Sequence, residues 1–324
     1  MAETTYLEAI RQGIWEEMER DESVFVIGED VGIYGGAFKV TQGLLEKFGD
    51  TRVIDTPISE AAIVGAAIGA SLVGMRPIAE MQFIDFISCA FDQITSFAAK
   101  SRYRWGAGVP IVVRGPCGGG VHGGPFHSQN VEAFFLNTPG LKIVEPATAY
   151  DAKGLIKAAI RDEDPVLYFE HKFLYRRIKE ELPQEDYIVP IGKAAVRREG
   201  SDLSIITYGA MVYTALEAAE TLAEEGIETE IIDLRTLLPM DEEAILETVK
   251  KTNRALVLHE ATRTGGAGGE ITARIMEHAF DFLDAPVIRV TAPDTPVPYS
   301  PPMEEYFLPQ AKDVVEAAKK LVAF

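Results

Sequence analysis

The sequence is poor in cysteine and in positive charge. Cys89 and Cys117 are its two cysteines, and neither has the spacing of a metal site, so we expect free thiols and no disulfide framework. Lys and Arg number 31 against 50 Asp and Glu, which gives a net charge of −19. This balance argues against nucleic acid and anionic membrane surfaces as partners and favours a basic protein partner.

Signals for export and for membrane insertion are also missing. Residues 1–5 have neither the basic nor the apolar region of a secretory leader, so we expect no export or transit peptide and a cytoplasmic location. The uncharged apolar stretch 61–74 is too short, and too rich in Gly and Ala, for a membrane span. We therefore expect no membrane association.

What the sequence does contain is an alternation of short apolar strands and helices. A length of 324 residues with 47% hydrophobic content allows a large core and two domains. In the first block, strand candidates lie at 24–27, 52–55, 77–81, 111–114, 142–145 and 166–169, and helix candidates at 5–20, 61–74, 85–100 and 150–161. Short apolar strands separated by helices predict an α/β domain whose mostly parallel sheet is covered on both faces.

A second α/β block follows a charged, irregular segment. Its strand candidates are 203–207, 228–232, 255–258 and 287–290, and its helix candidates are 211–225, 241–250, 270–280 and 310–322. The Pro-rich run 292–302 is typical of an extended surface segment. We place the first domain at 1–185, a linker at 186–200 and the second domain at 201–324.

One carboxylate stands at the entrance of an unusual helix. The strand 52–55 ends before Pro57, and Ser59 is a suitable N-cap, so Glu60 is predicted in the first helical turn. Such a Glu often only complements the helix dipole. However, the helix that follows is apolar on all sides, and we expect it to be buried all round. Glu60 then enters a buried place, where a carboxylate needs a partner or a proton.

A glycine-rich segment after the strand 111–114 has two readings. Its Gly-x-Gly-x-x-Gly pattern at 118–123, with Glu145 ending a strand about twenty residues later, matches the fingerprint of a nicotinamide-dependent Rossmann dehydrogenase. Against that reading, Pro125 follows the third glycine and a helix could begin only near Ser128. The alternative is that the glycines let the chain approach a cofactor or a partner closely.

The same segment presents two histidines, His122 and His127. A loop histidine is often only a surface residue, and a metal site would need a third ligand that is not found at a suitable spacing. Composition and spacing alone therefore do not assign them a role.

Several blocks, in order, resemble the beta subunits of thiamine diphosphate-dependent 2-oxo acid dehydrogenases, the decarboxylating components of lipoyl multienzyme complexes. The blocks are Ile27-Gly28-Glu29-Asp30-Val31-Gly32, Asp55-Thr56-Pro57-Ile58-Ser59-Glu60, Phe91-Asp92-Gln93-Ile94, His127-Ser128-Gln129, Thr138-Pro139-Gly140-Leu141-Lys142 and His259-Glu260-Ala261. The resemblance runs essentially end to end. It implies an α/β fold of two domains, a pyrimidine-binding parallel-sheet domain and a transketolase C-terminal-like domain.

The resemblance also implies the roles of particular residues. Glu60 matches the carboxyl group that hydrogen-bonds the aminopyrimidine nitrogen of thiamine diphosphate and so activates the cofactor. Phe86 and Ile58 match residues that line the pyrimidine ring, and Gln82 belongs to the same block as Phe86. His127 matches a proton-transfer and orienting group beside the reacting carbon. His122 remains a substrate-facing or supporting candidate.

An absence points to a partner chain. Thiamine enzymes hold the diphosphate through Mg²⁺ with a Gly-Asp-Gly motif and a later Asn, and this sequence has no such constellation. The resemblance therefore implies an alpha subunit that binds the Mg²⁺, in an α2β2 heterotetramer. Asp162 and Asp164 match the acidic part of a loop that binds a monovalent cation such as K⁺ in the family. A solvated turn is the alternative reading of these two acids.

The last partner and the substrate are also expectations from the resemblance. The second domain would dock the basic subunit-binding domain of a dihydrolipoyl acyltransferase, whose lipoyl domain is then acylated, and the carboxylate of Phe324 would be part of that contact. The sequence around His127 and the 91–94 block favour 2-oxoisovalerate and related branched-chain 2-oxo acids as substrates. Pyruvate, as in a pyruvate dehydrogenase beta subunit, is the alternative.

Overall fold

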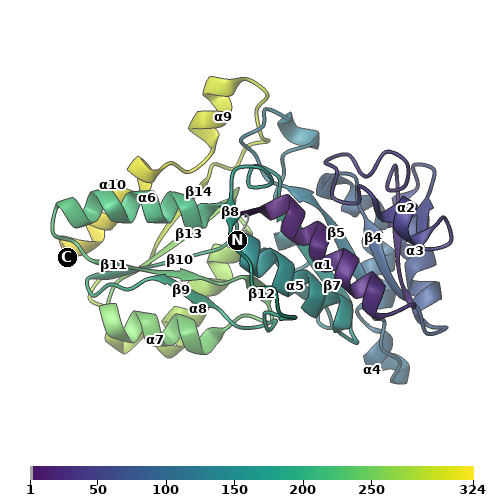
Figure 1. Ribbon diagram of the computed structural model, residues 1–324. Helices are drawn as coiled ribbons and strands as arrows, with labels where there is room; N and C mark the ends of the chain where they lie inside the picture. The colour runs from purple at the N-terminus through teal and green to yellow at the C-terminus, as the bar shows by residue number, and fades with distance from the viewer. Residues whose placement is uncertain (1–2) are drawn as a thin grey trace. The chain divides into compact units, whose positions relative to one another are not determined.

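A computed structural model describes residues 3–324, and these residues divide into two compact units (Figure 1). Of the described residues, unit 1 contains 3–117 and 134–191, and unit 2 contains 118–133 and 192–324. The second division falls between Ile191 and Gly192, inside the 186–200 segment expected to be a linker. The assignment of residues 118–133 to unit 2 was not expected, since this glycine-rich loop lies within the sequence of unit 1.

Unit 1 is built on a parallel sheet. Its strands run in the order β6-β7-β5-β4-β2-β3, and every pairing among them is parallel. Their bounds are β2 (Val24–Gly28), β3 (Val53–Asp55), β4 (Arg76–Glu80), β5 (Val112–Cys117), β6 (Lys142–Val144) and β7 (Val166–His171). Strands β2, β5 and β7 are buried along their whole length, as expected of a sheet with helices on both faces.

The helices of unit 1 follow local signals in the sequence. They are α1 (Tyr6–Arg20), α2 (Leu44–Phe48), α3 (Glu60–Ser71), α4 (Ser101–Trp105) and α5 (Ala149–Arg161), and the short β1 (Thr4–Thr5) pairs with β8 (Lys179–Glu180). A Thr5–Glu8 capping box begins α1, which lies within the expected helix 5–20. Helix α1 packs so closely on α5 that a Cβ on Gly13 would lie 2.4 Å from Cγ2 of Ile156.

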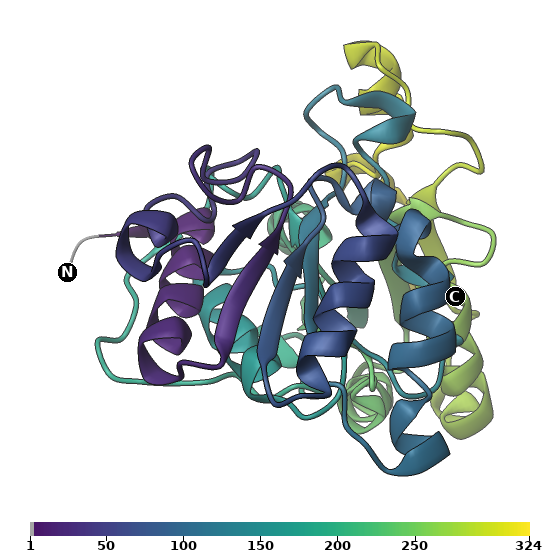
Figure 2. The same cartoon turned by 90° about the vertical axis from the view of Figure 1, so that its right-hand side faces the viewer.

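Two expectations for unit 1 were wrong. The segment 85–100 is not a regular α-helix but a 3-10 helix, η1 (Ile84–Ala90), followed by a π-helix, η2 (Gln93–Ala98), since hydrophobic periodicity does not distinguish these hydrogen-bond patterns from an α-helix. Helix α3 is not buried all round. A Cβ on Gly65 or Gly69 would meet nothing within 4 Å, and Val73 is 81% exposed. In Figure 2, α3 (dark blue) crosses in front of the strands of this sheet.

Unit 2 has a five-stranded sheet in the order β14-β13-β10-β11-β9, in which only β9 is antiparallel to its neighbour among the described strands. The strands are β9 (Ala195–Arg198), β10 (Leu203–Thr207), β11 (Thr229–Asp233), β13 (Ala255–Thr262) and β14 (Ile288–Ala292), and β12 (Thr236–Leu238) lies outside that sheet. Its helices are α6 (Met211–Glu224), α7 (Glu242–Thr252), α8 (Ala267–His278), α9 (Pro301–Phe307) and α10 (Ala311–Val322), with 3-10 turns η3 (Gly124–Phe126), η4 (Glu132–Phe134, whose last residue belongs to unit 1) and η5 (Phe280–Phe282).

Helix α9 was not expected at the end of the Pro-rich run. Pro301 and Pro302 occupy its first turn, where the missing N–H groups cost no helical hydrogen bond. Behind it, Phe307 and the partly buried Leu308 pack on Ala292 and Val297. Figures 1 and 2 both show α9 (yellow) beside the blue-green turn of the glycine-rich loop. The loop and α9 are thus neighbours although some 180 residues separate them in sequence.

Candidate functional site

The entrance of α3 is shaped by the end of β3. Pro57 separates the two elements, and α3 begins at Glu60 as predicted. Ser59 is the N-cap residue, but its hydroxyl donates a 3.0 Å hydrogen bond to the Pro57 carbonyl instead of accepting one from the helix. The carboxyl group of Glu60 is half-buried and lies in the first turn, where the helix dipole favours negative charge.

A second carboxyl group, that of Glu29, lies beside Glu60. Glu29 is 7% exposed, and one of its oxygens accepts a hydrogen bond from the Ser59 N–H. Burial, and then the nearby negative charge of Glu60, raise the pKa of the Glu29 carboxyl. Its Oε1 has no hydrogen-bond partner among residues 3–324. The helix entrance therefore holds two neighbouring acids, of which Glu29 is the more buried and has a raised pKa.

The other residues predicted to bind the cofactor in unit 1 are placed as follows. Gln82 lies after β4, and its amide donates a 3.1 Å hydrogen bond to Oδ2 of Asp30, the residue after Glu29. Phe86 lies on η1, and its ring packs edge-on against Phe83 with centroids 6.4 Å apart. Ile58, between β3 and α3, is 83% exposed. Carboxyl and amide groups are of the chemical types that can hydrogen-bond an aminopyrimidine.

In unit 2, the glycine-rich loop 118–133 presents both histidines. The Gly118 N–H donates a 3.1 Å hydrogen bond to the Gln129 carbonyl, which closes the loop on itself. His122 has a left-handed backbone, with φ of +60°, and its ring is about half exposed. His127 ends η3 and is half-buried, and its N–H donates to the Gly124 carbonyl at 3.3 Å.

Two buried carboxylates bind the backbone of this loop. Oε1 of Glu260, on β13, accepts a 2.6 Å hydrogen bond from the Gly119 N–H. Glu304, on α9, accepts hydrogen bonds from the N–H groups of Gly120 at 3.0 Å and His122 at 3.1 Å. The same carboxylate lies 2.6 Å from Nδ1 of His122. Consecutive loop N–H groups are thus bound by protein carboxylates.

This geometry overturns the dinucleotide-binding alternative. In a Rossmann fingerprint, glycine N–H groups and a helix N-terminus bind the pyrophosphate. Here the Gly119 and Gly120 N–H groups are taken by Glu260 and Glu304, and the pattern leads into the three-residue turn η3 rather than a helix. A dianionic pyrophosphate would have to replace two buried negative charges.

A buried acid, Glu132, lies near the end of the loop. Glu132 is fully buried, and Oε1 accepts a 2.6 Å hydrogen bond from the Tyr208 hydroxyl. Burial raises the pKa of Glu132 despite that hydrogen bond. The Tyr208 ring stacks on His259, with centroids 6.2 Å apart. Burial first, and then the positive charge of Arg289, lower the pKa of His259 to about 4, so this imidazole is neutral at physiological pH.

Asp162 and Asp164, the predicted cation ligands, are already paired with basic side chains. The Lys142 ammonium lies 2.6 and 2.7 Å from the two carboxylate oxygens of Asp162, and Nε of Arg102 lies 2.5 Å from Asp164. Arg76 donates to the backbone carbonyls of Ile160 at 3.1 Å and Asp162 at 2.9 Å. Oxygens that a monovalent cation could bind therefore carry nitrogen donors of the chain itself.

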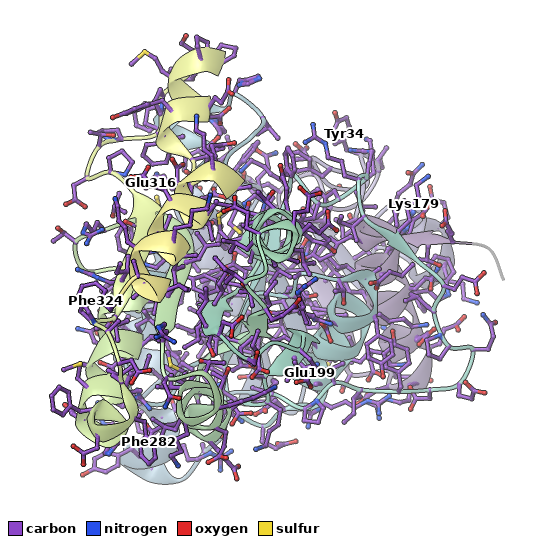
Figure 3. All side chains as sticks on the ribbon, turned by 90° about the vertical axis from the view of Figure 1, so that its left-hand side faces the viewer. Tyr34, Lys179, Glu199, Phe282, Glu316 and Phe324 are labelled. Carbon is purple, nitrogen blue, oxygen red and sulfur yellow. The ribbon has the colours of Figure 1, made fainter. Side chains whose placement is uncertain are left out.

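The remaining predicted contact residue, Phe324, follows α10 and is 72% exposed; Figure 3 labels it at the surface. Within residues 3–324, no cluster of three or more acidic, His or Cys side chains could hold a metal ion. No described helix is long and apolar enough to cross a membrane.

Sequence reasoning gave no role to three acids of this region: Glu260 and Glu304, which bind the loop, and Glu132, which lies within it. Glu260 was part of a recognised block, but no role was given to it. A glycine-rich loop has many N–H groups that need acceptors when buried, and this requirement was the available signal. The identity of the acceptors was not readable, because Glu304 lies on a helix that was not expected.

Comparisons with known proteins agree with the two-unit fold. Residues 2–177 match the transketolase pyrimidine binding domain, and residues 192–314 match the transketolase C-terminal domain. Among solved structures, a split-gene transketolase described as an inactive beta4 tetramer superposes with a TM-score of 0.82 at 24% identity, covering 99% of both chains. A transketolase from Pichia stipitis gives a TM-score of 0.71 at 17% identity, covering all of this chain and 46% of that one. These likenesses show the fold.

Curated relatives are much more similar in sequence. The 2-oxoisovalerate dehydrogenase subunit beta of Bacillus subtilis (strain 168) is 56% identical over 329 residues, with both chains covered completely. The pyruvate dehydrogenase E1 component subunit beta of the same organism is 46% identical, and that of Staphylococcus aureus (strain COL) is 45% identical, again with both chains covered completely.

Proposed function

Because the chain belongs to the beta subunits of thiamine diphosphate-dependent 2-oxo acid dehydrogenases, we propose that it forms half of the decarboxylating enzyme for branched-chain 2-oxo acids. The observation that supports this choice of substrate is the difference in sequence identity to two kinds of beta subunit. Identity is 56% to a 2-oxoisovalerate dehydrogenase beta subunit and 46% to a pyruvate dehydrogenase beta subunit of the same organism. Oxidative decarboxylation of 2-oxoisovalerate, with acyl transfer to a lipoyl group, is the proposed reaction.

Glu60 is the proposed catalytic acid of unit 1. Thiamine diphosphate, when bound, would supply the electron sink for decarboxylation. The Glu60 carboxyl group would hold a proton at the aminopyrimidine nitrogen, while Ile58, Gln82 and Phe86 would line that ring. The neighbouring Glu29, whose pKa is raised by burial and then by the nearby Glu60, places a second acid at the same helix entrance, which supports this location for the cofactor's ring.

His127 is the proposed proton-transfer group of unit 2. Its imidazole would orient the substrate and move a proton at a ring nitrogen, a contribution of roughly 10²- to 10⁴-fold in rate for a general acid. The half-buried ring lies on a loop whose backbone is bound at Gly119, Gly120 and His122, which supports a fixed orientation.

The proposed partner is an alpha subunit that supplies the Mg²⁺ and diphosphate ligands, in an α2β2 assembly. The sequence contains no Gly-Asp-Gly motif. Helix α3, which begins at Glu60, exposes a face that includes Ala62, Ala66 and Gly69 and continues into Val73. Small residues on that face would allow a partner chain to approach the helix that carries the catalytic acid.

A second proposed partner is the dihydrolipoyl acyltransferase, through its basic subunit-binding domain. The net charge of −19 and the exposed Phe324 at the C-terminal end of α10 support this contact. We place the complex in the cytoplasm. Deletion of Phe324 should weaken binding of the acyltransferase domain at low and moderate salt, and unchanged binding would exclude that residue from the contact.

The test is decarboxylation of 2-oxoisovalerate and of pyruvate with thiamine diphosphate and Mg²⁺. The chain alone, the chain with its alpha subunit and the Glu60→Gln pair are compared. Activity confined to the wild-type pair supports the split site, and the ratio of the two rates identifies the substrate. Faster reaction with pyruvate would replace the branched-chain assignment, and full activity of Glu60→Gln would exclude the catalytic role of Glu60.

A further inference from the structure

We propose that Glu304 is the positioning residue of the glycine-rich loop 118–133, and that Glu260 assists it. This loop carries His122 and His127 and is called the histidine loop below. This inference deepens the proposed function and rests on it for the role of His127. Glu304 is 1% exposed, yet it is an acid on a seven-residue helix whose other face, including Met303 and Tyr306, is largely exposed. A buried carboxylate requires strong hydrogen-bond donors, and the loop supplies all of those that the structure gives to Glu304.

The contacts of Glu304 with the loop are concentrated on two residues, Gly120 and His122. Its Oε1 accepts from the Gly120 N–H at 3.0 Å, and its Oε2 accepts from the His122 N–H at 3.1 Å. Oε2 also lies 2.6 Å from Nδ1 of His122. One carboxylate therefore fixes both the backbone and the ring orientation of His122.

The backbone of His122 needs such support. A φ of +60° is uncommon for a residue with a side chain, and such strain persists only where the surroundings impose it. Gly118 and Gly120 also have positive φ, of +81° and +78°. Without Glu304, the loop would lose the acceptors that hold this sequence of left-handed residues.

The second carboxylate, Glu260, binds the loop one residue before Gly120. It accepts from the Gly119 N–H at 2.6 Å. A Cβ on Gly119 would lie 3.0 Å from Cδ2 of Leu308, 3.3 Å from Oε1 of Glu304 and 3.5 Å from Oε1 of Glu260. The loop thus runs against both acids and against Leu308, which anchors the end of α9 on the apolar cluster of Phe307.

The consequence concerns His127, five residues beyond His122. With the loop closed by the bond from Gly118 to Gln129, fixing 119–122 restricts the short path that leads to His127. The rate of a proton transfer falls when the orientation of the transferring group is lost, even though the substrate still binds. Glu304 thus acts through the loop and touches no reacting atom.

The test uses the full chain paired with its alpha subunit. Glu304→Ala is expected to increase amide hydrogen exchange at Gly120 and His122 at least tenfold and to lower kcat about 10- to 100-fold, with KM changed less than threefold. Glu304→Gln, which keeps one acceptor oxygen, should recover part of both effects. Glu305→Gln, an exposed neighbour on the same helix, is the matched control and should change neither.

The outcomes separate the two proposals. Unchanged exchange and unchanged kcat in Glu304→Ala would overturn the positioning role. Increased exchange in a pair whose wild type has no decarboxylase activity would retain the loop contact while overturning the proposed function. If Glu304→Ala fails to fold, the same exchange and kcat comparison is made with Glu304→Gln.

The ion pairs around residues 162–164 support a second inference. We infer that the basic side chains of Arg76, Arg102 and Lys142 occupy the place of the monovalent cation that the family resemblance implied. Arg76 binds carbonyls of Ile160 and Asp162 at the C-terminal end of α5, where unpaired carbonyls and the helix dipole favour a positive charge. The site lies within unit 1.

The charges around this turn are balanced without an added ion. Asp162, Glu163 and Asp164 supply three negative charges, and their ion-pair partners Lys142, Arg76 and Arg102 supply three positive ones. Arg102 also donates to the Glu163 carbonyl at 3.3 Å. A bound K⁺ would add an uncompensated charge and compete with the Arg76 guanidinium for the same carbonyls.

Thermal unfolding of the full chain tests this inference without any activity measurement. Wild type is expected to unfold at the same Tm, within about 1 °C, in KCl and in tetramethylammonium chloride of equal ionic strength. Arg76→Ala should unfold lower and should regain several degrees in KCl only, since the vacated carbonyls can then accept K⁺. Lys320→Ala, which removes an exposed pair with Glu316, is the control.

A wild-type Tm that rises in KCl but not in tetramethylammonium chloride would overturn the replacement of the cation. An Arg76→Ala variant whose Tm is the same in both salts would also overturn it, because the carbonyls would then form no cation site. If this variant does not fold, the wild-type comparison alone decides.

Discussion

The Tyr208 hydroxyl donates a 2.6 Å hydrogen bond to the carboxyl group of Glu132, which is fully buried. This bond joins the last residues of the histidine loop to the residue that follows β10. Since burial raises the pKa of Glu132, the donor at Tyr208 offsets part of the cost of placing an acid there.

Tyr208→Phe is therefore expected to destabilise the chain by about 1 to 3 kcal/mol, the cost of leaving one buried polar group without its partner. The measurement is the free energy of unfolding from urea titration. Tyr306→Phe removes a hydroxyl from an 85% exposed side chain and should change stability by less than about 0.5 kcal/mol. Equal stabilities for the two variants would contradict the importance of the bond.

His259 should make the stability depend on pH. Its pKa is lowered from 6.5 to about 4 in the folded chain, so the unfolded chain binds a proton between these values and the folded chain does not. The contribution of His259 to stability is present above pH 6.5 and is lost as the pH falls toward 4, about 3 kcal/mol in total.

His259→Asn should remove that part of the acid dependence, measured as the free energy of unfolding at several pH values between 7 and 4. His278→Asn replaces a half-exposed histidine and serves as the control, with an acid dependence like that of wild type. A wild-type slope in the His259 variant would exclude this histidine as a source of acid sensitivity.

A comparison of Gly124 with Gly226 distinguishes the effect of backbone strain from the effect of close packing in the histidine loop. It has a φ of +67°, and a Cβ there would lie 2.2 to 2.4 Å from the Tyr299 ring. Gly226 has a φ of +82° with nothing within 4 Å. Gly226→Ala should cost about 1 kcal/mol, whereas Gly124→Ala should cost more and should lower kcat by displacing the loop.

Thermal unfolding and decarboxylation by the paired enzyme would check these two variants together. An equal loss of stability in both, with normal kcat, would mean that the Tyr299 contact does not position the loop.

Gly69 tests whether the exposed face of α3 binds the alpha subunit. Gly69→Leu adds a side chain into open space on a helix, so the isolated chain should keep or gain up to about 1 kcal/mol of stability. Association should nevertheless be weakened at least tenfold, because a small-residue contact would be filled. The readout is co-elution with the alpha subunit, and Glu220→Leu on the exposed side of α6 is the control.

If Gly69→Leu assembles as well as wild type, another surface must bind the alpha subunit. If it lowers the Tm of the isolated chain, the face is not open in solution.

The sequence allowed prediction wherever the signal was local. The Thr5–Glu8 capping box, the strand Leu203–Thr207 and the start of α3 at Glu60 each follow from residues within one or two turns. Helix α3 shows what local signals cannot predict. The sequence of an apolar helix does not indicate whether its own chain or another chain covers it.

Long-range pairing was the part that could not be predicted. Glu304 is far from Gly120 in sequence, and neither residue type indicates the other. The resemblance to a family supplied the candidate roles of Glu60 and His127, which chemistry alone would have left among ordinary surface residues.

The membership of loop 118–133 in unit 2 has a consequence for modular evolution. A cut between Ile191 and Gly192 yields a C-terminal fragment that keeps Glu260, Glu304 and Tyr208 but lacks the N–H groups and the carboxyl group that they bind. Recombination at that one junction would join acceptors from one ancestor to donors from another. The two halves of this gene are therefore expected to be inherited together, although each resembles a separate domain.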